Sequence, residues 1–201
     1  MGCWNWLLST DRRFVSPLSI WQWVRGRRPV HYGCRPATLN DLAFIRGEVE
    51  QGAKDGHYRD TLLHPVQLVG WIAQLGNVIR YSWLERYADQ RDALERIRAR
   101  LWVYGTAADD QIGYMLVAER YPGSGDAELE LYQAGVRKDR RGMGHGRRLV
   151  EQFANCAPPS VTLYARCLRP SDGMVRLLVR GGFEVIGTTE RGTRELVRKG
   201  G

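Results

Sequence analysis

The residues best suited to chemistry lie in one short segment, 136–150, which is rich in glycine and arginine. Gly142, Gly144 and Gly146 alternate with other residues, after an expected strand and at the start of an expected helix. Such a turn directs several backbone N–H groups into one concavity, with the positive end of the helix dipole behind them. Glycine lets a ligand approach the backbone closely because it has no Cβ. The segment therefore predicts a binding site for a pyrophosphate.

Two other glycine-rich phosphate motifs do not match this segment. The P-loop needs a Gly-Lys-Ser/Thr ending, which is missing, and the dinucleotide-binding pattern G-x-G-x-x-G differs from the G-x-G-x-G spacing found here. Six of the twelve residues from Arg137 to Arg148 are basic, which adds long-range attraction for a polyphosphate.

The segment resembles the acetyl-CoA-binding motif of the GNAT superfamily of acyl-CoA-dependent N-acyltransferases, written Arg/Gln-x-x-Gly-x-Gly/Ala. Here the motif reads Arg141-Gly142-Met143-Gly144-His145-Gly146. The pair Gly182-Phe183 and the stretch Arg35 to Asp41 are similar to further features of the family. The resemblance covers the chain from Val30 to Lys199 and implies an N-acetyltransferase that uses acetyl-CoA and no metal.

In the family, the backbone amides of this turn hold the CoA pyrophosphate, and the end of the preceding strand binds the pantetheine arm in the manner of an added strand. A local bulge of that strand is expected at Gly135. The resemblance implies this cofactor-binding group: Ala134, Val136, Arg141, Gly142, Met143, Gly144, His145, Gly146, Arg147 and Ser171.

Candidate catalytic groups lie on the strand before the turn. An amine acceptor is protonated near neutral pH and must lose its proton before it attacks a thioester. Glu128 and Glu130 share one face of the expected strand by period-two alternation. Glu130 is similar in position to the general-base Glu of histone-acetyltransferase-like members. The alternative interpretation is that both carboxylates face solvent or pair with nearby arginines.

The group that reprotonates the CoA thiolate does not follow the family pattern. In the family it is often a Tyr of the last helix, and Leu178 stands at that position here. Ser171 likewise stands where Asn is common. Tyr164, Tyr132 or water are the candidate substitutes, and Tyr164 joins Glu130 and Glu128 as a candidate catalytic residue.

The order of the elements predicts a mixed α/β fold with a mostly antiparallel central sheet flanked by helices, as in the GNAT family. Between Pro65 and Arg100 we expect two helices, broken near Gly76-Asn77, with Arg91, Glu95 and Arg98 forming salt bridges on a helix surface. The expected strands are His31–Arg35, Leu101–Tyr104, Ile112–Val117, Glu128–Gln133, Val161–Ala165, Phe183–Ile186 and Glu195–Val197. The other expected helices follow the capping box Thr38–Asp41, run from about Gly144 to Asn155, and run from Ser171 to Arg180.

Composition and charge limit the remaining choices. The chain has 201 residues and a net charge of +8, and it contains no apolar run of the roughly 18 to 20 residues that a membrane-spanning helix needs. Four of the seven tryptophans lie in residues 1–29, so we expect an N-terminal extension there, with peripheral membrane contact as one role, and an acyltransferase domain over 30–199. The four cysteines form no C-x-x-C pair, which favours a reducing cytoplasm.

The acceptor amine is not indicated by the sequence, and a small molecule, a peptide and a protein all remain open. A toxin that acetylates charged tRNA is a variant in the same fold. An acyl-CoA-binding module without turnover is an alternative of another class, and Leu178 favours it slightly. A nucleic-acid-binding protein is disfavoured because no such motif is present. A homodimer is an expectation from analogy alone.

Overall fold

The computed structural model of the protein describes residues 32–87, 94–106, 110–120 and 128–200. The expected N-terminal extension, residues 1–29, lies outside the described residues, as do Arg91 and the loop 121–127. In the part of the chain that is described, no helix is long and apolar enough to cross a membrane.

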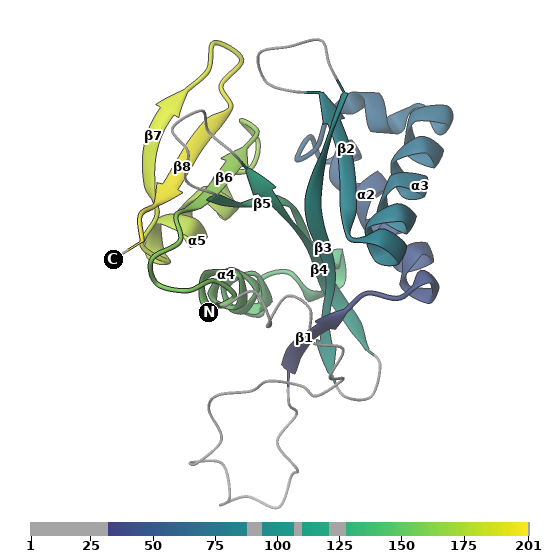
Figure 1. Ribbon diagram of the computed structural model, residues 1–201, viewed down its shortest axis with the longest axis horizontal. Helices are drawn as coiled ribbons and strands as arrows, with labels where there is room; N and C mark the ends of the chain where they lie inside the picture. The colour runs from purple at the N-terminus through teal and green to yellow at the C-terminus, as the bar shows by residue number, and fades with distance from the viewer. Residues whose placement is uncertain (1–31, 88–93, 107–109, 121–127, 201) are drawn as a thin grey trace, which may run out of the picture.

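One central sheet organises the chain (Figure 1). Its strands lie in the order β1-β3-β4-β5-β6-β8-β7, and β2 pairs with β3 beside this path. All pairs are antiparallel except β5 with β6. The strands are β1 (Tyr32–Pro36), β2 (Trp83–Tyr87), β3 (Leu94–Thr106), β4 (Gln111–Arg120), β5 (Glu128–Val136), β6 (Leu163–Cys167), β7 (Glu184–Thr188) and β8 (Arg194–Arg198). The predicted fold class, a mixed and mostly antiparallel sheet with flanking helices, is confirmed.

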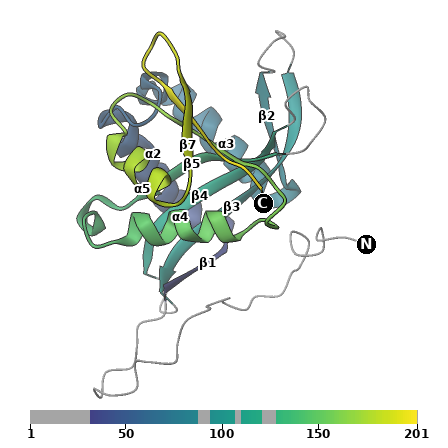
Figure 2. The ribbon, with the colours of Figure 1, turned by 90° about the vertical axis from the view of Figure 1, so that its left-hand side faces the viewer.

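Helices cover both faces of the sheet and bury a separate apolar cluster on each face (Figures 1 and 2). Helices α2 (Leu42–Lys54) and α3 (Pro65–Tyr81) pack over β2, β3 and β4. Helices α4 (His145–Asn155) and α5 (Asp172–Arg180) pack on the opposite face. The short 3-10 turns η1 (Leu39–Asp41), η2 (Asp60–Leu63) and η3 (Lys138–Arg140) connect the elements. The face with α2 and α3 is called the acceptor face below.

A buried carboxylate fixes the start of α2 against the sheet. Asp41 accepts a bidentate hydrogen bond from Arg35 on β1, with both distances 2.8 Å, and further bonds from the Thr38 N–H and Gln111. Burial alone would raise the pKa of Asp41, but these hydrogen bonds outweigh it and lower the pKa to about 2. The predicted capping box is therefore part of a larger ionic cluster.

The prediction of two helices between Pro65 and Arg100 is wrong. Helix α3 runs without a break through Gly76, which lies against Leu42 of α2, and it ends at Ser82 in the left-handed conformation. The chain from Trp83 onward forms β2 and β3, so Glu95 and Arg98 lie on a strand and form no helix-surface pair.

The reason for the error is the composition of β3. Its first half is made of good helix formers, but buried Ile97, Ala99 and Leu101 alternate with polar arginines at period two. Pairing with β2 on one side and β4 on the other then overrides the local helix propensity.

The parallel strands β5 and β6 separate after a short paired stretch. Their register ends with Leu131 opposite Ala165, and the rest of β5, from Tyr132 to Val136, has no strand partner on that side among the described residues. A sheet interrupted in this way exposes main-chain hydrogen-bonding groups in its middle. This opening between β5 and β6 is called the split.

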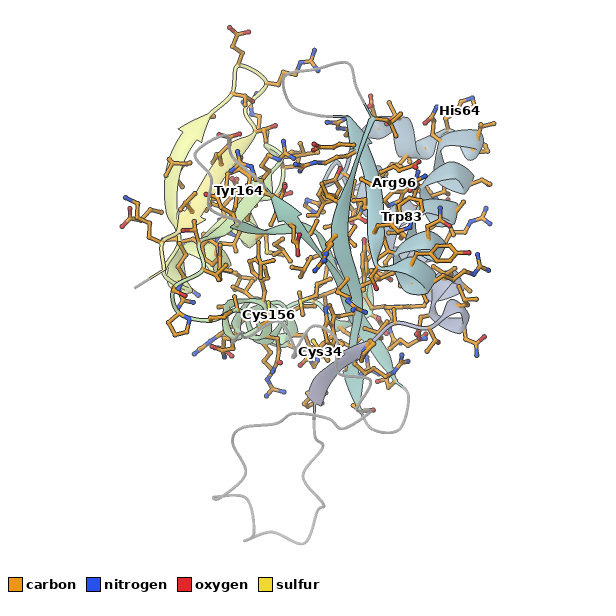
Figure 3. The ribbon with its side chains drawn as sticks, in the orientation of Figure 1. Cys34, His64, Trp83, Arg96, Cys156 and Tyr164 are labelled. Carbon is orange, nitrogen blue, oxygen red and sulfur yellow. The ribbon has the colours of Figure 1, made fainter. Side chains whose placement is uncertain are left out.

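Buried thiols complete the core. Of the cysteines in the described residues, Cys34, Cys156 and Cys167 are free, and two of them are labelled in Figure 3. Burial raises the pKa of Cys34 and of Cys156 to about 12 and that of Cys167 to about 11, so all three stay protonated at neutral pH.

Candidate active site

The glycine-rich turn between η3 and α4 has the conformation that its sequence predicts. Gly142 and Gly144 have φ of +79° and +83°, in the left-handed region where a side chain is strained. A Cβ at either position would meet nothing within 4 Å, so both glycines border open space. Gly146, in contrast, is needed for packing, because its Cβ would lie 3.0 Å from Leu177 Cδ1.

The main-chain N–H groups of this turn are available to a ligand. Among the described residues, no hydrogen bond uses the N–H groups of residues 142–147, and the first one of the helix joins Arg148 N–H to Gly144 O at 3.2 Å. The first N–H groups of a helix lack internal partners and carry the positive end of its dipole. An anion such as a pyrophosphate fits this cradle.

Most basic side chains around the turn already have carboxylate partners. Arg137 and Arg140 both pair with Asp110, at 3.2 and 3.3 Å, and Arg137 also binds Asp139. Arg147 forms an exposed pair with Glu151. The sequence count of basic residues therefore overstates the positive charge that a ligand meets, and the main chain is the stronger feature of the site.

The two non-glycine residues inside the turn, Met143 and His145, have different surroundings. His145 is 6% exposed, and its ring lies against Tyr32 and Tyr104, with Nδ1 3.3 Å from the Tyr104 hydroxyl. Burial lowers the pKa of His145, so the ring is neutral at pH 7. Met143 is largely exposed. At His145 the side chain is therefore part of the core, and its main chain is the part available to a ligand.

Arg141 links the turn to its surroundings. Its Nη1 lies 2.7 Å from Asp55 Oδ2, and its Nε donates to Val136 O at 3.0 Å. The hydrogen bond from Arg141 holds the pKa of Asp55 below its ordinary value. The first residue of the motif therefore orders the end of β5 and the loop after α2.

The end of β5 presents an unpaired main-chain edge to the split. Arg137 N–H donates to Ile112 O at 2.8 Å, so by the alternation of a strand Ala134 and Val136 direct their own N–H and C=O groups away from β4. The Val136 carbonyl accepts Arg141, and the Ala134 carbonyl accepts the Tyr58 hydroxyl at 2.6 Å. The two N–H groups remain directed into the split.

The bulge expected at Gly135 lies three residues earlier. Gln133 pairs with Leu116 and Leu131 with Val117, so Tyr132 is the extra residue, whereas Gly135 pairs regularly with Tyr114. Gly135 is required for space instead, because its Cβ would lie 2.7 Å from the Tyr114 ring.

The bulge directs neighbouring side chains to the acceptor face. Tyr132 stacks on Trp71 of α3, with ring centroids 6.0 Å apart, and Gln133 accepts a hydrogen bond from the Trp71 indole at 3.2 Å. Two consecutive side chains on one face are a common result of a bulge. Burial raises the pKa of Tyr132.

Glu130 is a buried carboxylate between two arginines. It is 2% exposed, and its Oε1 accepts from Arg166 of β6 at 3.0 Å while its Oε2 lies 3.4 Å from Arg86 of β2. Glu128 pairs with Arg120 at 2.8 Å. Both carboxylates therefore pair with nearby arginines, and their catalytic role stays a prediction.

Tyr164 lies on β6 directly beside Glu130 in the strand register, and Figure 3 labels its position. Its ring is 1% exposed and lies beneath the guanidinium of Arg120, 3.8 Å from the ring centroid. Burial raises the pKa of Tyr164 well above that of a free phenol, which keeps its proton on at neutral pH. Leu178 is fully buried in the core, so that position contributes no acid.

The loop that follows α2 closes over the edge of β5 at the split. Tyr58 accepts a hydrogen bond from the Tyr114 hydroxyl at 2.9 Å, and burial raises the pKa of Tyr58 far above that of a free phenol. His57 Nδ1 lies 3.2 Å from Ser171 Oγ, at the start of α5. The loop thus touches β5, the glycine-rich turn and α5 together. Only Gly52, whose missing side chain leaves room for the Tyr58 ring, was a signal in the sequence.

Glu48 of α2 borders the same loop. Its Oε2 is buried and has no hydrogen-bond partner among the described residues. Burial raises the pKa of Glu48, against the opposing effect of Arg141 and Arg137.

Comparison with known proteins identifies the fold. No protein-family model and no curated protein matches the chain. Solved structures do match it, among them an acetyltransferase from Thermus thermophilus, with 20% identity, a TM-score of 0.58, and coverage of 84% of this chain and 97% of that one. A GCN5-related N-acetyltransferase from Kribbella flavida has 19% identity, a TM-score of 0.58 and coverage of 84% and 97%.

The spermidine N-acetyltransferase of Vibrio cholerae, solved in complex with CoA and spermine, has 14% identity and a TM-score of 0.57, with coverage of 83% of this chain and 94% of that one. At these identities the likeness establishes the fold. The chain has the fold of the GNAT acetyltransferases, as the resemblance of its glycine-rich motif implies.

Proposed function

We propose that this protein is an N-acetyltransferase that moves the acetyl group of acetyl-CoA to a primary amine of a small molecule, a peptide or a protein. The observation that carries the proposal is the continuity of two main-chain features. The open cradle of N–H groups at residues 142–147 lies directly after the unpaired edge of β5. A diphosphate and an extended amide-bearing arm have the chemistry that such neighbouring features bind.

In this proposal the cradle holds the pyrophosphate through the main chain of Gly142 to Arg147. The N–H groups of Ala134 and Val136 bind the amide carbonyls of the pantetheine arm along β5. Ser171, held by His57, lines the other side of the split. The thioester then lies near the Tyr132 bulge, where the acceptor face carries Glu130 and Tyr164.

The reaction needs an amine nitrogen to lose a proton and attack the thioester carbonyl, after which the carbon–sulfur bond breaks and the thiolate takes up a proton. We assign proton acceptance to Glu130, with Glu128 as the neighbouring carboxylate, and donation to Tyr164. Arg86 and Arg166 hold the Glu130 carboxylate in place. Holding the amine against the thioester supplies much of the rate acceleration by itself.

A second candidate function is an acyl-CoA-binding module without turnover. The arginine partners on both oxygens of Glu130 favour it, because oxygens already in contact with guanidinium groups are less accessible to the proton of an amine. The buried Leu178 favours it as well. The acetyl-CoA site is the same in both functions.

One pair of measurements distinguishes the two functions. Thermal unfolding with acetyl-CoA is expected to show a concentration-dependent rise in Tm, because a ligand that binds only the folded state stabilises it. Release of free thiol from acetyl-CoA across a panel of amines then reports turnover. A Tm rise without thiol release for any amine supports the silent module, and the absence of a Tm rise contradicts both functions.

A further inference from the structure

A hollow of about 510 Å³ lies between the turn that joins β7 to β8 and the start of α5. The turn is at the upper left of Figure 1. The charged residues of its lining are Arg169, Asp172, Glu190, Arg191 and Arg194. Arginines outnumber carboxylates in this wall, and no role in binding CoA was assigned above to any of them.

The wall of the hollow is a built turn. Gly192 N–H donates to Thr189 O at 2.8 Å, and Thr189 N–H donates to Thr193 O at 2.9 Å. Thr193 N–H also donates to Thr189 Oγ1 at 3.1 Å. The aliphatic stem of Arg169 lies against Gly192, where a Cβ would come within 3.2 Å of it. The turn and the Arg169 side chain therefore support one another.

The three arginines of the hollow differ in what they already bind. Arg194 donates to the Asp172 carboxylate and to Arg169 O, so its charge is used inside the protein. In the described part of the chain, the guanidinium groups of Arg169 and Arg191 have no ion pair and no hydrogen bond. With Arg194 and Asp172 paired, two guanidinium groups face one remaining carboxylate, Glu190. The hollow is thus suited to an anion.

The hollow is close enough to the split for one small molecule to reach both. Arg169 follows Arg166 by three residues, and Arg166 binds Glu130 at 3.0 Å. Arg169 also precedes Ser171, on the other side of the split, by two residues. At about 3.3 Å for each extended residue, the chain from Arg166 to Arg169 spans at most roughly 10 Å.

We propose that Arg169 and Arg191 bind a carboxylate or phosphate group of the acceptor, so that the amine acetylated by this protein belongs to a small acidic molecule. The inference rests on the proposed acetyltransferase function and specifies its substrate class. Guanidinium groups bind carboxylates and phosphates through paired hydrogen bonds, which adds orientation to attraction. An anion fixed there directs the far end of the molecule, its amino group, toward the split.

The 3′-phosphate of CoA is another source of the same chemistry, and the test separates the two. Thiol release is measured with 8-aminooctanoate and with its uncharged amide, which differ only in the anion. The wild-type protein is expected to have at least a tenfold higher kcat/KM for the acid. The double variant Arg169→Gln/Arg191→Gln, which retains part of each stem, is expected to lose this preference and keep its activity on the amide.

Arg180→Gln at the end of α5 is the matched control, since it removes an exposed arginine outside the hollow and should change neither value. Equal kcat/KM for acid and amide in the wild-type protein overturns the proposal. A double variant that keeps the preference for the acid also overturns it. A double variant that instead loses the preference for acetyl-CoA over 3′-dephospho-acetyl-CoA overturns it too, because that result assigns the hollow to CoA.

A binding measurement keeps the proposal testable without turnover. Calorimetric titration of the CoA-saturated protein with 8-aminooctanoate is expected to show binding that the double variant lacks. Absence of binding to the wild-type protein overturns the proposal. Binding that depends on both arginines, together with no thiol release for any amine, contradicts the acetyltransferase function and leaves the anion site supported.

Discussion

The glycine-rich turn and the acceptor face hold their groups in place by different means. The turn, residues 141–146, offers main-chain N–H groups whose direction is set by two glycines with positive φ. The acceptor face offers side chains, and Glu130 is fixed there by arginines from β2 and β6, which are 44 residues before it and 36 residues after it in sequence. One site is local in the chain and the other is assembled by the sheet.

This difference determines how each site tolerates change. Main-chain donors depend on backbone conformation and are insensitive to most neighbouring side chains. A buried ionic cluster depends on every member, because removal of one partner leaves an uncompensated charge away from water. Variants of the two sites should therefore fail in different measurements.

The largest effect is expected for Glu130→Gln. It removes the negative charge that lies between Arg86 and Arg166, and breaking a buried ionic contact in this way costs about 3 kcal/mol of unfolding free energy. For a chain of this length the Tm should fall by roughly 10 °C, measured by calorimetry. If Glu130 accepts the proton, kcat should also fall by about a hundredfold.

The control for Glu130→Gln is Glu50→Gln, which makes the same chemical change at an exposed pair with Lys54 on α2. Exposed pairs are screened by solvent and contribute little to stability, so its Tm should stay close to that of the wild type. A Glu130→Gln protein with wild-type Tm would contradict the ionic cluster. A stable variant with unchanged kcat would remove Glu130 from the mechanism.

Asp41 sharpens the comparison, because its ionic cluster is partly local in sequence. Its pKa is lowered in the folded state, so the stability it contributes is present above its unfolded pKa, near 4, and is lost as the pH falls through about 2. Asp41→Asn should lower the free energy of unfolding by roughly 2 kcal/mol at pH 7. Urea unfolding at several pH values measures this, and the gap between the two proteins should close between pH 4 and 2. A gap independent of pH would contradict the assignment.

The smallest effect on folding, and a specific effect on binding, is expected for Gly144→Ala. An L-residue in the left-handed region costs about 1–2 kcal/mol, which the turn avoids by changing its backbone conformation. Acetyl-CoA affinity, measured by titration calorimetry, should fall by about tenfold. Gly47→Ala on α2, where a Cβ has open space, is the control and should bind normally. Undiminished affinity in Gly144→Ala would argue against the cradle.

The fold was predictable from sequence wherever local pattern and tertiary pairing agree. Helices α4 and α5 follow the predicted ranges closely, and the predicted hairpin of β3 and β4 and strand β5 are present, although all three strands are longer than predicted. The segment that became β2 and the start of β3 was not predictable, because arginine, glutamate and leucine favour helices and only Ile97, Ala99 and Leu101 show the strand period. Pairing partners far along the chain decided its conformation.

The candidate site was likewise predictable only where its features are local in the sequence. The turn was found because six contiguous residues contain it, and the conformation of Gly142 and Gly144 agrees with that prediction. The contacts of Tyr58 with Ala134, of Asp55 with Arg141 and of Arg86 with Glu130 join residues that sequence spacing does not relate. Such contacts exist only once the sheet has formed.

The single extra residue at Tyr132 has a consequence for the direction of the whole strand end. If Tyr132 instead paired regularly with Leu116, each later residue would shift by one position, so the main-chain groups of Ala134 and Val136 would face β4 and those of their neighbours would face the split. A strand of the same sequence without the bulge would thus present a different set of donors to an incoming arm. Binding of an extended ligand in the middle of the sheet therefore depends on the pairing register of β5 as much as on the identity of its residues.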